Sequence, residues 1–338
     1  MDFFTLLANG GSAGDSPSIF DSASPAAESI SNLSILVLAV SGLIFLVVEG
    51  ILFYSVFRFR RRRGEDTAEP PQVYGSKSIE IAWTAAPALI VFFLVLAITR
   101  TLWEVEVDPP KPQAGDQTLF VTVVGRQWWW EYRYEYYDGR KLDFITANEL
   151  HLPASAEGAA RRVYLRLESA DVCHSFWVPR LAGKTDLIPG HTNEMWLETR
   201  ETGLHVGQCA EYCGTQHAGM LLRLVVEEPA DFERWLEREA RPAADAPQVR
   251  AARDVFLAQS CVNCHRVRGT PAQGTYAPDL THLMSRKTLA SGILENNREN
   301  LDRWVRDPQS IKSGCLMPDF KLSDAEREQI VLYLLTLE

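Results

Sequence analysis

The chain has few cysteines and no surplus of basic residues. Its 338 residues include only six cysteines, too few for a scaffold held together by disulfides. Asp and Glu number 44 against 34 Lys and Arg, so the basic surface typical of nucleic-acid binding is missing. Hydrophobic residues make up 46% and charged residues 23%, which excludes a wholly disordered chain and a transporter with many spans. We therefore expect a protein of about two domains or more with no nucleic-acid partner.

Basic residues are absent before Arg58. Two long apolar runs lie on either side of this arginine, Leu33–Phe57 before it and Ile79–Trp103 after it. Each run is long enough to cross a hydrocarbon core of about 30 Å. Arginines cluster between the runs, at positions 58 and 60–63, whereas acidic residues flank the outer ends. Because basic residues concentrate in cytoplasmic loops, we predict a transmembrane hairpin with both termini and the soluble domains outside the cytoplasm. No cleavable signal peptide is recognisable at the N-terminus.

Composition divides the chain into four parts. Residues 1–30 are rich in Ser, Ala, Gly and Asp, which predicts a solvated extracytoplasmic tail. Residues 31–106 form the predicted hairpin with its arginine-rich loop. Residues 107–240 contain short alternating apolar runs such as LFVTVVG and MLLRLVVEE, which predict a β-sandwich or barrel. Residues 241–338 begin with the linker-like RPAADAPQ and continue with helical periods.

Three helical segments are expected in the last part, together with one at the end of the β-domain. Pro229–Ala240 is amphipathic, and helical spacing recurs over Val255–His265, Asn300–Asp307 and Ser323–Leu337. The last of these opens on Ser323 followed by Glu326, the pattern of a capping box.

Soft metal ligands gather in GQCAEYCGTQHAGM, near the end of the β-domain. With a histidine from ADVCHSFWVP, the candidate ligands are His174, Cys209, Cys213, His217 and Met220. A disulfide would leave His217 and Met220 without a role, and a structural zinc site has little use for methionine. A copper centre uses all five, and two thiolates suit two copper ions that share the sulfurs.

This segment resembles the binuclear copper (CuA) loop of cytochrome c oxidase subunit II. GRQWWWEYRY, LAGKTDLIPGHTN and IEIAWTAAPA resemble further segments of that family, and the resemblance covers about residues 31–235. It implies a cupredoxin-like sandwich in which His174, Cys209, Cys213, His217 and Met220 bind copper through their side chains.

The resemblance also implies roles for three residues beyond these side chains. Glu211 would offer its backbone carbonyl to copper, and its side chain would reach a magnesium site shared with subunit I. Trp128 matches the tryptophan at which electrons enter, although packing alone would also account for it. Glu80 matches a carboxylate at the mouth of a proton path into subunit I.

A second motif, CVNCHR, carries the CxxCH pattern of covalent haem attachment. Cys261 and Cys264 would form thioethers to the haem, and His265 would be an axial ligand. A redox dithiol or a zinc site is the alternative. Met317, in LMPDF, resembles the sixth-ligand methionine of class I cytochromes c, with Met284 as the alternative. This resemblance covers about residues 249–338 and implies an all-α domain.

The parts together resemble subunit II of a caa-type haem-copper oxidase, with a cytochrome c domain fused to its C-terminus. The resemblance implies a bacterial cytoplasmic membrane and an external donor, cytochrome c or respiratory complex III. Electrons would pass through haem c and CuA to haem a of subunit I, where oxygen is reduced and protons are pumped. The alternatives are the CuA subunit of a nitric oxide reductase and a membrane-anchored copper or haem carrier.

Two cysteines have no place in either site. Cys173 adjoins His174 and is expected to behave as a small buried hydrophobe. Cys315 lies two residues before Met317 and has no assigned role.

Overall fold

The structure is a computed structural model that describes residues 18–60, 72, 74–106, 118–155, 161–244 and 246–338. The chain separates into two compact units. One unit is Glu28–Asp108, and the other combines Met1–Ala27 with Pro109–Glu338. Arg61, Arg62 and Arg63 of the predicted cytoplasmic loop lie outside the described residues.

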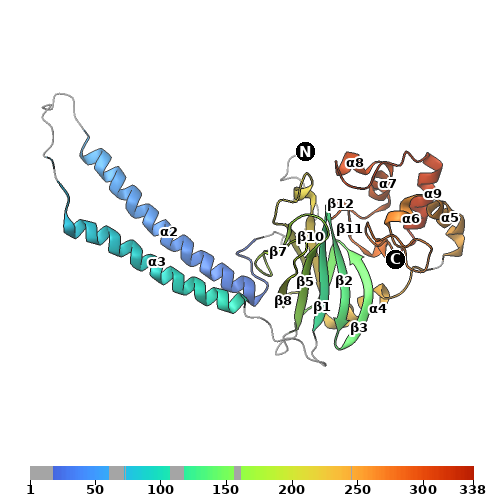
Figure 1. Cartoon of the computed structure of the whole chain (residues 1–338), viewed down its shortest axis with the longest axis horizontal. Helices are drawn as coiled ribbons and strands as arrows, with labels where there is room; N and C mark the ends of the chain where they lie inside the picture. The colour runs from blue at the N-terminus through green and yellow to red at the C-terminus, as the bar shows by residue number, and fades with distance from the viewer. Residues whose placement is uncertain (1–17, 61–71, 73, 107–117, 156–160, 245) are drawn as a thin grey trace. The chain divides into compact units, whose positions relative to one another are not determined.

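The first unit is a pair of long helices, α2 (Pro25–Arg58) and α3 (Lys77–Glu106) (Figure 1). Both are long and apolar enough to cross a membrane. Apolar side chains are exposed along both helices, as expected for a helix that is apolar all round and faces lipid. Near the ends of the pair, the Ser29 hydroxyl donates a hydrogen bond of 2.9 Å to Glu104. The predicted two-helix hairpin is confirmed.

The prediction of a solvated tail over residues 1–30 fails for its described end. Helix α2 already begins at Pro25, and Ala23 and Ala27 are buried. The Ala23 amide donates to the carbonyl of Arg180, and the Arg180 guanidinium pairs with Asp21 at 2.9 Å. Small side chains let this segment pack against the part of the same unit around Arg180, so its low hydrophobicity does not leave it in solvent.

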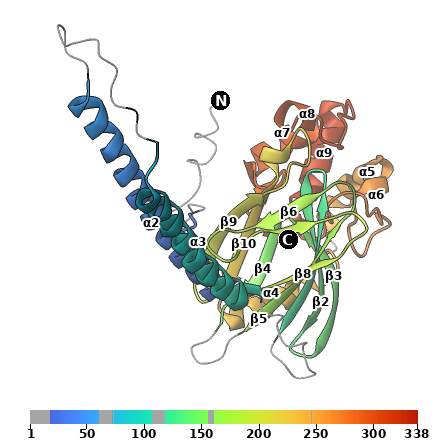
Figure 2. The ribbon, with the colours of Figure 1, turned by 60° about the vertical axis from the view of Figure 1, so that its left-hand side comes forward.

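The second unit contains two five-stranded sheets, with strand orders β3-β2-β1-β5-β8 and β4-β10-β9-β6-β7. Pairs β1/β5 and β10/β4 are parallel, and the other pairs are antiparallel. Figure 2 shows the sheets from a second side. The strands are β1 (Leu119–Arg126), β2 (Trp129–Tyr137), β3 (Arg140–Ala147), β4 (Glu149–Pro153), β5 (Arg162–Ser169), β6 (His174–Trp177), β7 (Thr185–Leu187), β8 (Asn193–Glu198), β9 (Gly203–Cys209) and β10 (Leu221–Glu227).

The core of the sandwich follows the alternation of the sequence. In β10, Leu222, Leu224 and Val226 are buried while the residues between them are partly exposed, because successive side chains of a strand point to opposite faces. Large aromatic residues, Trp130 and Tyr132 among them, fill the same core. The predicted β-sandwich is confirmed.

Helix α4 (Pro229–Glu239) packs its apolar face on this sandwich. Trp235 is buried, stacks on His151 with ring centroids 4.3 Å apart, and contacts Tyr134 at 5.1 Å. The helix predicted over Pro229–Ala240 ends one residue earlier in the structure, at Glu239.

We expect Trp235→Ala to destabilise the sandwich by about 3–5 kcal/mol, the usual cost of emptying a buried tryptophan site. Urea unfolding of a soluble fragment covering residues 118–240 measures this loss. Trp196→Ala, at a partly exposed tryptophan, serves as control and should cost less. Equal losses in the two variants would contradict the packing role of α4.

The C-terminal part is a helical domain. Its elements are 3-10 helices η2 (Pro247–Val249) and η3 (Leu283–Ser285), short strands β11 (Thr288–Leu289) and β12 (Leu294–Glu295), and helices α5 (Arg250–Ala258), α6 (Cys261–Cys264), α7 (Arg298–Arg306), α8 (Pro308–Ile311) and α9 (Asp324–Leu334). Phe256 of α5 and Tyr333 of α9 meet in the core, with ring centroids 5.2 Å apart. The capping box of Ser323 and Glu326 is present at the start of α9. The predicted helix over Val255–His265 is divided, because Gln259 is extended and separates α5 from α6.

Candidate copper and haem sites

The loop between β9 and β10 gathers the first group of predicted ligands. Cys209 ends β9, and the 3-10 helix η1 (His217–Gly219) returns the chain to β10. The Cys209 amide donates to the Met220 carbonyl at 3.0 Å, which closes the loop. His174 opens β6, the strand that pairs with the end of β9. Strand pairing therefore brings a distant histidine to the loop.

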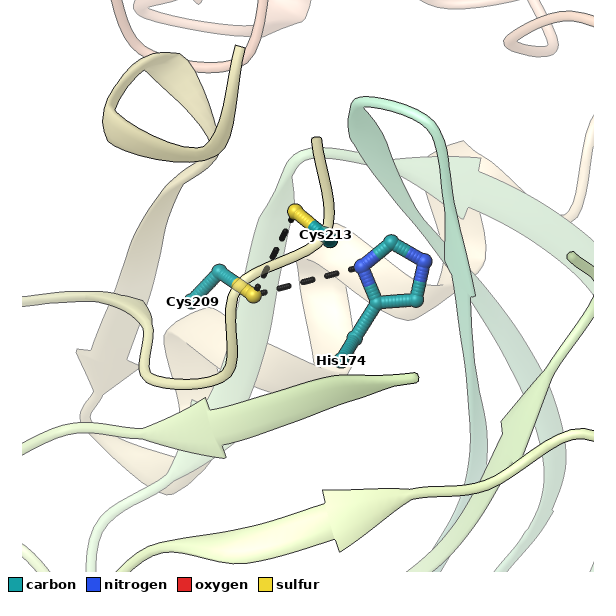
Figure 3. Close-up of side chains that lie close together, drawn as sticks. All are labelled: His174, Cys209 and Cys213. Carbon is teal, nitrogen blue, oxygen red and sulfur yellow. Dashed lines mark hydrogen bonds between the residues drawn. The ribbon is translucent and has the colours of Figure 1, made fainter. Parts of the chain in front are cut away.

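The ligand atoms converge at short distances. Sγ of Cys209 lies 3.8 Å from Sγ of Cys213 and 3.9 Å from Nδ1 of His174. Figure 3 shows these three side chains pointing toward one another. Sγ of Cys213 lies 3.7 Å from Nδ1 of His217 and 3.9 Å from Sδ of Met220. Each sulfur thus has its own imidazole.

The set is completed by Glu211, whose carbonyl accepts from the Cys209 thiol at 3.2 Å. Two adjacent sulfurs, two imidazoles, one thioether and one carbonyl fit a pair of copper ions that share the sulfurs. A zinc ion would leave the thioether unused. The side chain of Glu211 is exposed.

The two thiols influence each other's protonation. The hydrogen bond between them holds the pKa of Cys209 below its usual value and raises the pKa of Cys213. The pair therefore loses one proton readily and holds the second, which a bound metal must displace.

Asp171 is a site residue that the sequence analysis missed. One carboxylate oxygen lies 2.8 Å from Nε2 of His174, and the other accepts from the Gln127 amide at 2.7 Å. Burial opposes the charge on both partners, but their mutual hydrogen bond raises the pKa of His174 and lowers the pKa of Asp171. A carboxylate on the second nitrogen typically orients a metal-binding histidine. An acid three residues before a candidate ligand was the available signal.

We expect Asp171→Asn to weaken copper binding about 10- to 100-fold, as loss of such a partner usually does. Competition of the soluble part with a copper chelator measures the affinity. Asp186→Asn, at a partly exposed aspartate of β7, serves as control. Equal affinities in the Asp171 variant and the unaltered protein would contradict the orienting role.

Trp128 lies directly against the loop. Its indole Nε1 donates to the Cys213 carbonyl at 3.0 Å, and the Gln127 amide side chain donates to the same oxygen at 2.7 Å. Gly125 allows the imidazole of His174 to lie close to the β1 backbone, because a Cβ at this position would lie 2.7 Å from Cδ2 of His174. The end of β1 and the turn that leads to β2 thus form part of the wall of the site.

Two other predicted positions lie apart from this cluster. Glu80 is in the first turn of α3 and is exposed in this chain. Cys173 is exposed, so the expectation of a small buried hydrophobe is wrong: it precedes β6, which begins at the fully buried His174, and so does not lie on a strand face that packs in the core.

The second group of predicted ligands lines one apolar cavity, bounded mostly by the helical domain and partly by the sandwich, of about 1350 Å³ including its open mouth. The residues are Cys261, Cys264, His265 and Met317. Two thiols, an imidazole and a thioether around a largely apolar cavity fit a haem with two thioether bonds and histidine and methionine ligands. Met284 is not among the residues that line it.

The histidine is held in one orientation. Nδ1 of His265 lies 2.7 Å from the Pro278 carbonyl, which leaves Nε2 for a metal. Burial lowers the pKa of His265, so its neutral form is favoured. Gly274 allows the chain to fold over the motif, since a Cβ there would lie 2.4 Å from the backbone of Cys264.

Comparison with known proteins finds three matching family models. Residues 119–228 match the periplasmic domain of cytochrome c oxidase subunit II, residues 16–99 match its transmembrane domain, and residues 249–338 match cytochrome c. The chain is therefore a membrane protein with a periplasmic domain.

Two similar proteins are both named cytochrome c oxidase subunit 2. Cytochrome c oxidase subunit 2 of Alkalihalophilus pseudofirmus is 37% identical, over 100% of this chain and 96% of the relative. Cytochrome c oxidase subunit 2 of Bacillus subtilis is 32% identical, over 84% and 81%. A crystal structure of the periplasmic domain of subunit II from Bradyrhizobium japonicum is 32% identical, covers 38% of this chain and 95% of its own, and has a TM-score of 0.32. The ligand-rich loop, the cytochrome c domain and the match over the full length of this chain to the Alkalihalophilus pseudofirmus relative show that the chain belongs to the cytochrome c oxidase subunit 2 family.

Proposed function

We propose that this chain is the electron-entry subunit of a caa-type oxidase. Electrons from an external cytochrome c or respiratory complex III pass through haem c and CuA to haem a of subunit I, where oxygen is reduced and protons are pumped. The observation that carries the proposal is the presence, in one chain, of two separate donor sets that fit copper and haem. When bound, each group would take up and release one electron at a time.

In this proposal the first donor set binds the copper pair. Its members are His174, Cys209, Cys213, His217, Met220 and the carbonyl of Glu211. The distances around the two sulfurs support it, as does the hydrogen bond of His174 with Asp171. The exposed side chain of Glu211 is then available for a magnesium ion shared with subunit I.

The second donor set binds haem c, with Cys261 and Cys264 as attachment points and His265 and Met317 as axial ligands. Their common cavity supports this assignment. Trp128 is proposed as the point where electrons enter the copper site, because its indole N–H donates a hydrogen bond to the carbonyl of Cys213. Glu80, exposed on α3, is proposed as the start of a proton path in subunit I.

The chain is proposed to lie in a bacterial cytoplasmic membrane with both termini outside the cytoplasm. The basic residue Arg58 in the last turn of α2 and the acidic Glu28 in its first turn support this orientation. The exposed apolar surface of both helices would face lipid and subunit I.

An absorption spectrum of the soluble part from Thr118 onward, after haem attachment and copper addition, tests the proposal. Recorded through the near-infrared, oxidised and then reduced, it should show a c-type haem band together with a band of mixed-valence copper that disappears on reduction. A haem band without the copper band would overturn the CuA assignment and favour a membrane-anchored cytochrome.

A further inference from the structure

The two sites meet within the second unit. Gln127, Trp128, Trp129 and Asn148 of the sandwich line the same cavity as the CxxCH motif. Trp128 is only 8% exposed, although it lies at the edge of the copper loop. The helical domain therefore covers the residue proposed for electron entry.

A buried lysine crosses this contact. Lys312 follows α8 of the helical domain and is 3% exposed. Its ammonium donates to the carbonyls of Trp128 at 2.6 Å and Gly219 at 2.9 Å, both in the sandwich, and to Ala290 of its own domain at 3.1 Å. The ammonium thus satisfies two carbonyls that adjoin the copper loop, which water would otherwise have to satisfy.

A buried anion crosses the contact in the opposite direction. Glu149 of β4 is 2% exposed. Its carboxylate accepts from the amides of Lys287 and Thr288 at 2.9 and 2.8 Å and from the Thr288 hydroxyl at 2.8 Å, all in the helical domain. Hydrogen bonds to a charged group are about twice as strong as neutral ones. Each domain therefore holds a buried polar side chain of the other at a defined position.

We infer that Glu149 and Lys312 are positioning residues that hold the haem domain over Trp128, in the arrangement that the proposed transfer from haem to copper requires. The inference rests on the proposed function. With both groups bound, the haem iron would lose one electron and the copper pair would gain it, with no proton transferred and no bond formed or broken. A held domain makes this step independent of encounter, whereas transfer from a separate protein depends on concentration and salt.

The test uses the full-length chain in detergent, loaded with haem and copper, with the variants Glu149→Gln and Lys312→Met. Glu194→Gln, at an exposed glutamate of β8, is the matched control. A photoexcited flavin reduces the haem, and the rate of electron transfer to copper is followed. The unaltered chain and the control should transfer at a rate independent of protein concentration and salt. The two variants should transfer at least tenfold more slowly.

Hydrogen exchange of the Lys287 and Thr288 amides gives a second readout that needs no electron transfer. Both amides should exchange at least tenfold faster in Glu149→Gln, while haem and copper absorption stay unchanged. Wild-type rates and protection in both variants would overturn the inference. Faster exchange in the variants, combined with no transfer in the unaltered chain, would support the docking role and overturn the proposed electron path. If Lys312→Met does not fold, the transfer rate and the hydrogen exchange of Glu149→Gln alone test the inference.

Discussion

Cys213→Ser is expected to abolish the near-infrared copper band of the soluble part while leaving the haem band intact. The Cys213 sulfur lies within 4 Å of Cys209, His217 and Met220, so its loss removes the group common to most of the cluster. A serine hydroxyl does not ionise at neutral pH and is a poor copper ligand. The loss of copper affinity should exceed the 10- to 100-fold that outer partners cost.

Cys173→Ser is the control, because this thiol is a close neighbour of His174 but is exposed. It should retain the full copper band. A normal band in Cys213→Ser would contradict the shared-sulfur site. Loss of the band in Cys173→Ser would indicate that Cys173 binds copper, contrary to the geometry of the site.

Met317→Ala is expected to leave the haem covalently attached but to lower its reduction potential by on the order of 0.2 V, about a quarter of the range that axial ligands span. Methionine opposite histidine raises the potential of a c-type haem. Met317 lines the cavity with His265. Removal of the Met317 thioether should therefore also abolish the charge-transfer absorption band of the sulfur–iron bond. Redox titration followed by visible spectroscopy measures both changes.

Met284→Ala provides the comparison, since Met284 packs against the core of the helical domain and is not among the cavity-lining residues. Its potential should stay within a few tens of millivolts of the original, below one tenfold step of about 59 mV. A large fall in Met284→Ala with none in Met317→Ala would reverse the ligand assignment.

The sequence by itself determined much of the local structure. Long apolar runs predict α2 and α3 because a membrane span needs only length and hydrophobicity. The alternation in MLLRLVVEE predicts β10, and Ser323 with Glu326 predicts the start of α9, because both signals depend on near neighbours in the chain. Candidate ligands could be named for the same reason, as most lie within one loop or one motif.

Only the tertiary structure decided which distant groups act together. Asp171 reaches His174 across the bend that precedes β6, and the presence of an acid three residues before the histidine does not by itself establish this contact. The buried end of the N-terminal segment depends on Arg180, more than 150 residues away. Glu149 and Lys312 look like ordinary surface charges in the sequence, since helical or strand spacing does not reveal a partner domain. Their burial is set by the contact between two domains, which the packing of the whole unit determines.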